Sequence, residues 1–357
     1  MKTYIKFLIT LFIKSFFKVF FIFFSLILII NIFEQMEFLK QSNTSYLLPI
    51  FLSFLNTPSL IFEILPFIFL ITTQILFVKL MENNELAVFK YTGLTNVRIV
   101  TIIGFFSFLF GLLLIIFYYN FSAKLKNSYL EIKNSYSDDN KYLAVITENG
   151  LWLKDEINQN INIINASKVN NQFLLDVVIT QFDLNYNYKK TIQASKVDIS
   201  DNNWVIYSPL ISEKNVTNSY KQILLGSNFD LKRINSLFSN LSSLTFFEIF
   251  TLRKNYKSLN YSLIDIDSHL IKLSTYPFYL AIMTILSSII MLNIGYQKNL
   301  MINIVSGVLI SVLIYYVNFF FNILGTSEKI PVILSIMLPL GILTLINSIF
   351  LVRLNEK

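Results

Sequence analysis

Four long segments of this chain contain no charged side chain, and they constrain the fold more than any other feature. They are residues 99–123, 273–297, 299–327 and 330–352. A helix needs about 20 predominantly apolar residues to cross a bilayer. Each Leu, Ile, Phe or Val near its centre favours insertion by about 0.3–0.6 kcal/mol. The four segments are therefore predicted to be transmembrane helices, and the low charged fraction of the chain, 14%, agrees with that prediction.

Residues 19–33 are apolar enough to form a further span. Lysines precede them at multiples of four residues, which predicts a basic stripe on an interfacial lead-in segment: Lys2, Lys6, Lys14 and Lys18. A cleaved signal peptide is the alternative, but no small-residue cleavage site follows Ile30. We therefore expect this segment to remain as the first transmembrane helix.

Residues 60–78 form the remaining candidate span, although they include Glu63, Pro66 and Gln74. An ionisable residue within a span is a functional candidate by default. Glu63 lies near the outer end of this span, which favours a carboxylate at the depth of the lipid headgroups. Both interpretations of Glu63 stay open at this point.

The basic residues that flank the six predicted spans are unevenly distributed. If the N-terminus is cytosolic, the inner flanks receive Lys2, Lys6, Lys14, Lys18, Lys79, Lys90, Arg98, Lys298, Arg353 and Lys357. The outer flanks receive only Lys40, Lys272 and Lys329. The positive-inside rule then predicts a multi-pass inner (cytoplasmic) membrane protein with both termini in the cytosol. Because the net charge of +7 gathers beside the spans, no nucleic-acid partner is expected.

The region between the third and fourth spans, residues 122–268, has short alternating runs in place of long apolar blocks. Strands are predicted at residues 142–147, 150–154, 161–164, 174–180, 191–194, 204–207 and 222–225, with a hairpin turn at 148–150. Residues 231–257 are predicted to be more helical. An extracytoplasmic antiparallel sandwich or open barrel is therefore expected.

No catalytic or cofactor-binding motif is recognisable. The sequence contains no P-loop, Gly-rich dinucleotide turn, HExxH or GxSxG motif. It has no Cys and one His, which argues against disulfides, thiol chemistry and a zinc centre. His269 lies beside Asp265 and Asp267, but an interfacial histidine is favoured over a Ser-His-Asp triad because no nucleophile signature is present. We therefore expect no catalytic site, no metal and no cofactor.

The loop between the second and third spans, residues 79–95, predicts a short amphipathic helix. Glu82 and Glu85 would occupy its first turn, where carboxylates face the positive end of the helix dipole. Leu86 and Phe89 would supply its apolar side, and Gly93 falls where a helix C-cap is expected. Such a helix either lies on the membrane surface or docks into a groove of a partner protein. Periodicity does not distinguish these two interpretations.

The same loop carries the first part of a family resemblance, in Leu80, the Asn83-Asn84 pair, Glu85-Leu86 and Gly93. Two further matches precede this loop, at Pro58 and Leu65-Pro66-Phe67. Others follow it at Gly150-Leu151-Trp152-Leu153-Lys154, Tyr276-Pro277-Phe278, Ile330-Pro331 and Leu338-Pro339. Together they resemble the LptF/LptG (YjgP/YjgQ) lipopolysaccharide export permease family. Phe33-Glu34-Gln35 and the Gly-Leu-Trp strand make the chain most similar to LptG. Asn31 departs from the basic residue that LptG members often carry there.

The resemblance implies a membrane protein of six transmembrane α-helices with an inserted all-β periplasmic jellyroll-like domain. Residues 1–121 would form helices one to three with a cytosolic coupling helix at about 81–95, residues 122–268 the β domain, and residues 269–357 helices four to six. The family extracts lipopolysaccharide from the inner membrane as a subunit of an ABC-type complex. The implied partners are an LptB-like ATPase dimer, a second permease (LptF) and an LptC-like protein.

Two groups of site residues follow from that resemblance. Coupling to the ATPase would use Glu82, Glu85, Leu86, Phe89 and Gly93, and lipid binding would use Lys40 and Glu34. ATP hydrolysis would take place in the partner, so this chain would be a transporter subunit and not an enzyme.

Three alternatives remain open on the sequence alone. The chain could be the LptF paralogue of the same complex. It could also be a mechanotransmission permease of the FtsX or macrolide-exporter type, which usually has four spans. A membrane-anchored enzyme or receptor would instead show an activity in residues 122–268.

Overall fold

The computed structural model of this chain describes residues 3–40, 45, 47–136, 151–157, 159–170, 172–213, 216–231, 234, 240–258, 262–293 and 300–355. Two compact units are present. The helical unit contains residues 1–126 and 263–357, and the β unit contains residues 127–262.

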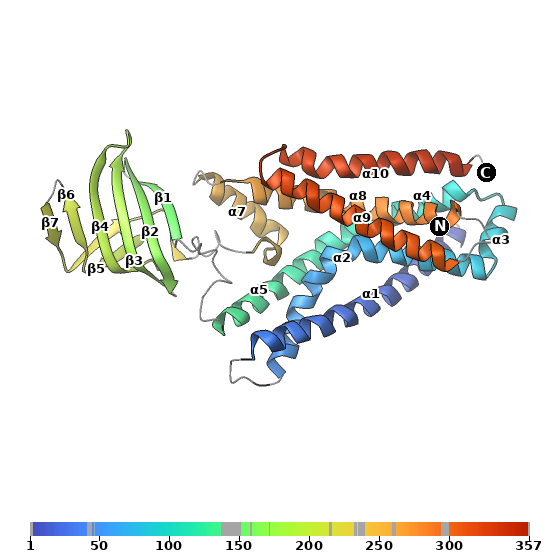
Figure 1. Ribbon diagram of the computed structural model, residues 1–357, viewed down its shortest axis with the longest axis horizontal. Helices are drawn as coiled ribbons and strands as arrows, with labels where there is room; N and C mark the ends of the chain where they lie inside the picture. Colours follow the sequence, from blue (N-terminus) through green and yellow to red (C-terminus); the bar gives the residue numbers. More distant parts are fainter. Residues whose placement is uncertain are drawn as a thin grey trace. The chain divides into compact units, whose positions relative to one another are not determined.

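Long helices account for most of the helical unit (Figure 1). In chain order they are α1 (Thr3–Phe38), α2 (Leu47–Glu82), α3 (Glu85–Tyr91), α4 (Asn96–Leu113), the π-helical turn η1 (Leu114–Tyr119), α5 (Asn120–Ser135), α8 (Ile264–Asn293), α9 (Leu300–Thr326) and α10 (Val332–Asn355). Within the described part of the chain, six helices are long and apolar enough to cross a membrane, with α4, η1 and α5 counted as one. The prediction of six transmembrane helices is confirmed.

Helices α2 and α8 form the centre of the helical unit. In each of them 61% of the apolar stretch is buried, against 17% in α1, α9 and α10. α1 packs on α2, while α8 packs on α2, α4 and α10. The three outer helices therefore leave most of their apolar surface uncovered, as expected for helices that face lipid or another membrane subunit.

The predicted lead-in segment is helical and packs on the helical unit. Residues 3–18 are the first turns of α1 and continue without a break into the span. Leu8, Phe12 and Phe16 are at most 3% exposed. The rings of Phe12 and Phe16 meet the ring of Phe69 in α2 edge-on, at centroid distances of 5.8 and 5.4 Å. One face of these turns is therefore buried in the helical unit, and their position at the membrane interface stays a prediction.

Hydrogen bonds between helices compensate for prolines within the spans. Pro66 in α2 has no N–H, so the carbonyl of Phe62, four residues earlier, loses its helical donor. The hydroxyl of Tyr276 in α8 donates to this carbonyl. Tyr118 donates to the carbonyl of Pro58 at 3.0 Å and so adds a second contact to the backbone of α2. The Tyr276 contact satisfies a backbone group that lipid cannot hydrogen-bond.

The β unit contains one antiparallel sheet. Its strands are β1 (Leu151–Ile157), β2 (Asn160–Asn170), β3 (Phe173–Asp183), β4 (Tyr188–Asp198), β5 (Asn203–Tyr207), β6 (Leu210–Glu213), β7 (Val216–Ser219) and β8 (Gln222–Gly226). The order is β1-β2-β3-β4-β5-β8, with β6 paired to β4 and β7 paired to β6. The predicted strands at 150–154, 161–164, 174–180, 191–194, 204–207 and 222–225 are confirmed by β1 to β5 and β8. The expected strand at 142–147 and turn at 148–150 lie outside the described residues.

One face of the sheet carries the core of the β unit. Leu153, Ile164, Ile179 and Ile192 lie opposite one another across β1 to β4 and are at most 2% exposed. Trp204 is fully buried over this face, and its indole N–H donates to the carbonyl of Phe229 at 2.6 Å. A row of polar side chains comes next to this apolar row along the same strands.

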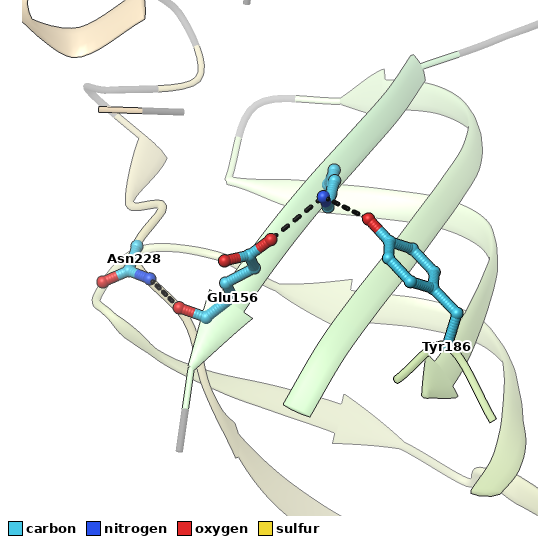
Figure 2. Close-up of polar contacts among 4 residues, drawn as sticks. Glu156, Tyr186 and Asn228 are labelled. Carbon is cyan, nitrogen blue, oxygen red and sulfur yellow. Dashed lines mark hydrogen bonds and ion pairs between the residues drawn. The ribbon is translucent and has the colours of Figure 1, made fainter. Parts of the chain in front are cut away.

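Side chains connect β1, the first strand in the order of the sheet, with the segment that follows β8, the last strand. Asp155 in β1 is 1% exposed. It accepts hydrogen bonds from the Ser227 hydroxyl at 2.8 Å, the Asn228 side-chain amide at 2.8 Å and the Asn228 backbone N–H at 3.1 Å, just after β8. Asn228 also donates to the Glu156 carbonyl at 3.0 Å, as Figure 2 shows. We call these three residues, Asp155, Ser227 and Asn228, the carboxylate clamp.

The segment predicted to be helical at 231–257 is helical only in part. The described helix α7 spans Phe246–Ser258. Glu248 accepts from the N–H and the hydroxyl of Thr245, both at 2.8 Å, which sets the start of the helix as one half of a capping box. Before it, Leu241–Ser243 form a 3₁₀ turn.

Candidate functional site

Helix α3 lies between α2 and α4 and is held by two apolar side chains. Leu86 is 2% exposed, and the ring of Phe89 packs edge-on against Phe7 of α1 at 6.0 Å. The opposite side is open, since Val88 and Tyr91 are 57% and 91% exposed. Helix α3 is thus fixed to the helical unit by one side and presents the other to its surroundings.

The end of α3 has the predicted glycine cap. Gly93 has a φ of 80°, which a residue with a Cβ rarely adopts. The Gly93 N–H donates to the Lys90 carbonyl at 3.0 Å, and the Leu94 N–H donates to the Phe89 carbonyl at 2.9 Å. This pair of hydrogen bonds is a Schellman motif, so the prediction of a C-cap at Gly93 is confirmed.

The prediction for Glu82 is wrong in its placement. Helix α2 continues through Glu82, so this carboxylate lies at the C-terminal end of α2 and not in the first turn of α3. The break comes at Asn84, which has a φ of 57°. Asn tolerates this left-handed conformation better than most residues. Among the predicted coupling residues, Glu85 is the acidic residue in the first turn of α3.

Glu85 has an unusual environment for a carboxylate. One of its oxygens, Oε2, is closed to solvent and accepts no hydrogen bond from the described residues. A carboxylate oxygen shielded from water and without a donor is energetically unfavourable. Oε2 therefore faces the interior of the helical unit, and the contacts of α3 with its surroundings come from its exposed side.

A polar cluster that the sequence did not predict lies at the ends of α1, α2 and α5. Asn31 of α1 is 1% exposed, and its oxygen accepts from Gln35 at 3.0 Å and from Asn56 of α2 at 3.3 Å. The ammonium group of Lys126 in α5 donates to the Asn56 oxygen at 2.5 Å. We call Asn31, Gln35, Asn56 and Lys126 the amide–lysine cluster. Lys126 thus brings a positive charge to this group of neutral amides.

The two predicted lipid-binding residues lie near the same end of α1. Glu34 is an exposed residue of α1, and Lys40 is exposed in the turn that follows. The Lys40 N–H donates to the Glu37 carbonyl at 3.3 Å, which closes the end of the helix. The structure places Glu34 and Lys40 in the region of the amide–lysine cluster along the chain, but it shows no lipid contact for either residue.

Two other titratable residues of the sequence analysis lie within the helical unit. Glu63 is exposed on α2, with the positive charges of Lys126 and Lys272 attracting its carboxylate. His269 is half-buried, and its Nε2 lies 2.9 Å from the hydroxyl of Tyr119. No group of three His, Cys, Asp or Glu residues in the described ranges is arranged to hold a metal ion.

The described residues define a multi-pass membrane protein with an antiparallel β unit between its third and fourth spans. The family model for the lipopolysaccharide export system permease LptF/LptG matches residues 6–353. The chain therefore belongs to the LptF/LptG family of lipopolysaccharide export permeases, and the resemblance found in its sequence is confirmed. A comparison with individually curated proteins gives no match.

Proposed function

We propose that this chain is the LptG-type subunit of an ABC-type complex that extracts lipopolysaccharide from the inner membrane. Its partners would be an LptB-like ATPase dimer, a second permease of the LptF type, and an LptC-like protein. Family membership over nearly the whole chain supports a role in lipopolysaccharide export. The LptG assignment rests on Phe33-Glu34-Gln35 and on the strand that contains Trp152.

Energy would enter through α3 on the cytosolic side. The open side of α3 supports this role most directly, because Val88 and Tyr91 are exposed there and Glu85 places a negative charge in the first turn of the same short helix. Leu86 and Phe89 fix α3 to α1 and α2, and the Gly93 cap sets its length. A displacement of α3 would therefore be transmitted to the helices that contact the lipid.

Lipid capture would take place at the other end of these helices. Lys40 and Lys126 are cations that can pair with a lipid phosphate as point charges, and Glu34 lies on the exposed side of α1. The amides of Asn31 and Asn56 hold Lys126 in place. The β unit would then receive the lipid on the periplasmic side and pair one of its edge strands with the LptC-like protein.

A charge reversal at Glu85 tests the coupling role. Glu85→Lys should prevent co-purification of the LptB-like ATPase and remove lipopolysaccharide-stimulated ATP hydrolysis, because an ammonium group would replace the acceptor at the docking surface. Glu328→Lys, which changes an exposed carboxylate between α9 and α10, is the matched control and should leave both unchanged. Normal ATPase binding and stimulation in Glu85→Lys would refute the coupling role.

The number of spans distinguishes the proposal from its main competitor. Permeases of the FtsX or macrolide-exporter type usually have four spans, whereas six candidate spans are found in the described part of this chain. The LptF and LptG assignments are separated by co-purification: an LptG-type subunit should recover a second permease of the LptF type.

A further inference from the structure

The β unit contains an open pocket to which the proposed function assigns no role. Its volume is about 840 Å³, within the range of about 300–1,000 Å³ typical of small-molecule sites. Five strands contribute the residues that line it: Asn160, Gln181, Tyr188, Lys189, Lys190, Ser212, Glu213 and Thr217. We call it the lysine pocket.

Every residue that lines the lysine pocket carries a polar group. The lining combines side-chain amides, three hydroxyl groups, two lysines and one glutamate. Such a surface offers both donors and acceptors, which suits a ligand whose hydroxyl groups also donate and accept. The excess of ammonium groups over carboxylates favours a ligand with negative charge.

Strand register builds the base of the pocket. Asn162, Gln181 and Lys190 lie opposite one another on β2, β3 and β4, two residues along from the apolar row of Ile164, Ile179 and Ile192. Gln181 donates to the Asn162 oxygen at 2.9 Å. The amide nitrogen of Asn162 is closed to solvent and has no acceptor among the described residues. The apolar face of the sheet thus ends in a row of polar side chains.

A β-bulge adds the second lysine. Gln181 pairs with Lys190 and Phe182 pairs with Tyr188, so Lys189 is an extra residue in β4. Its ammonium group donates to the Asn160 oxygen at 2.6 Å. Bulges are common beside functional sites because they redirect a side chain. Ser212 of β6 and Thr217 of β7 also line the pocket, and their hydroxyl oxygens are hydrogen-bonded at 3.0 Å.

We propose that the lysine pocket binds a phosphorylated sugar unit. Lys189 and Lys190 pair with the phosphate, while Gln181, Ser212 and Glu213 hydrogen-bond the sugar hydroxyls. Two sources have this chemistry, namely the saccharide part of a lipid and a free sugar phosphate. The assignment to the saccharide of the exported lipid rests on the proposed function, whereas sugar phosphate binding does not.

Binding is tested on the full-length chain in nanodiscs, with glucose 6-phosphate, glucose and inorganic phosphate followed by ligand-observed NMR. Glucose 6-phosphate should bind saturably and more tightly than either fragment. Lys190→Glu should weaken it at least about tenfold, and Ser212→Trp should do the same by filling the pocket without changing its charge. Lys168→Glu, an exposed lysine of β2 outside the pocket, is the control. No saturable binding, or an equal loss in Lys168→Glu, would overturn the proposal.

Photo-crosslinking in cells separates the two sources. A crosslinker at Thr217 should capture lipopolysaccharide with its phosphorylated core sugars but not a lipid lacking them, while one at exposed Met36 of α1 captures both. Capture at Met36 alone, with no glucose 6-phosphate binding, overturns the pocket and leaves the proposed function standing. Glucose 6-phosphate binding with no lipid captured at either position supports a free sugar phosphate as ligand and counts against the proposed function.

Discussion

The carboxylate clamp makes the stability of the β unit depend on one buried side chain. Asp155→Ala removes the acceptor of three hydrogen bonds that join β1 to the segment after β8. The Asn228 side chain keeps its bond to the Glu156 carbonyl. The Ser227 hydroxyl and the Asn228 backbone N–H lose this acceptor, at a cost of about 1–3 kcal/mol each. We therefore expect a loss of about 4 kcal/mol in the free energy of unfolding of the β unit.

The assay uses the two tryptophans of the chain, Trp152 and Trp204, which both lie in the β unit. Trp204 is fully buried, so its fluorescence reports the unfolding of the β unit in urea. With a denaturant slope of about 2 kcal/mol per molar, the midpoint of Asp155→Ala should fall by about 2 M.

Glu156→Ala is the control for this measurement. Its carboxylate is 50% exposed and lies 2.9 Å from the Lys154 ammonium group (Figure 2). Exposed ion pairs contribute about 0–1 kcal/mol, so the midpoint should move little. An Asp155→Ala midpoint as close to wild type as that of Glu156→Ala would refute the role of the clamp.

Three further predictions test other parts of the molecule. In Gly307→Ala, the new Cβ would lie 2.0 Å from Nε2 of Gln74, which donates to the Asn303 and Ile304 carbonyls at 3.2 and 3.3 Å. Thermal unfolding in nanodiscs should therefore show that this variant loses about 1–3 kcal/mol of stability. In the control Gly341→Ala the new Cβ meets no atom within 4 Å, so no loss of stability is expected. Lys40→Glu should reduce lipopolysaccharide capture by a crosslinker at Met36, with Lys40→Arg as control, and undiminished capture would argue against a lipid contact. Hydrogen bonds from the Asn187 side chain and backbone lower the pKa of Asp183. The stability that these hydrogen bonds provide is present above the pKa of the unfolded state and is lost as the pH falls through the pKa of the folded state. Asn187→Ala should raise the pKa of Asp183 in a carboxyl NMR titration, and an unchanged pKa would contradict the assignment.

The spans could be predicted because their signal is local. Apolar length alone identifies a transmembrane helix, and it did so even for α2, which contains Glu63 and three prolines. The buried face of the first turns of α1 was not part of that prediction, which considered only the lysines of this segment. Leu8, Phe12, Phe16 and Val19 recur at helical spacing and are buried, and that pattern was readable in the sequence.

The two strands that were not predicted, β6 and β7, have no alternation of buried and exposed residues. All four residues of β7 are exposed, and β6 has no fully buried residue. β6 is a strand because it pairs with β4, and β7 because it pairs with β6. Alternating hydrophobicity in a sequence indicates a strand with one buried face, so it cannot predict a strand in which neither face is buried.

The amide–lysine cluster and the lysine pocket were not predictable for a different reason. Asn31, Asn56 and Lys126 come from three separate helices, and Lys126 lies in a segment that the sequence assigned to the β domain. Their types are common and their spacing in the chain is uninformative. Glu85 and Gly93, by contrast, lie in one short loop whose cap pattern is local, which is why the sequence located them.

The proposed function requires α3 and the β unit to lie on opposite sides of the membrane. The chain has no Cys, so single cysteines at Val88 of α3 and Leu184 of the β3–β4 turn, which are 57% and 59% exposed, can be labelled selectively. In cells whose outer membrane has been opened, a membrane-impermeant maleimide should label Leu184→Cys at once and Val88→Cys only after the inner membrane is permeabilised. Labelling of both before permeabilisation, or of Val88→Cys alone, would contradict a permease that takes up force in the cytosol and delivers lipid to the periplasm.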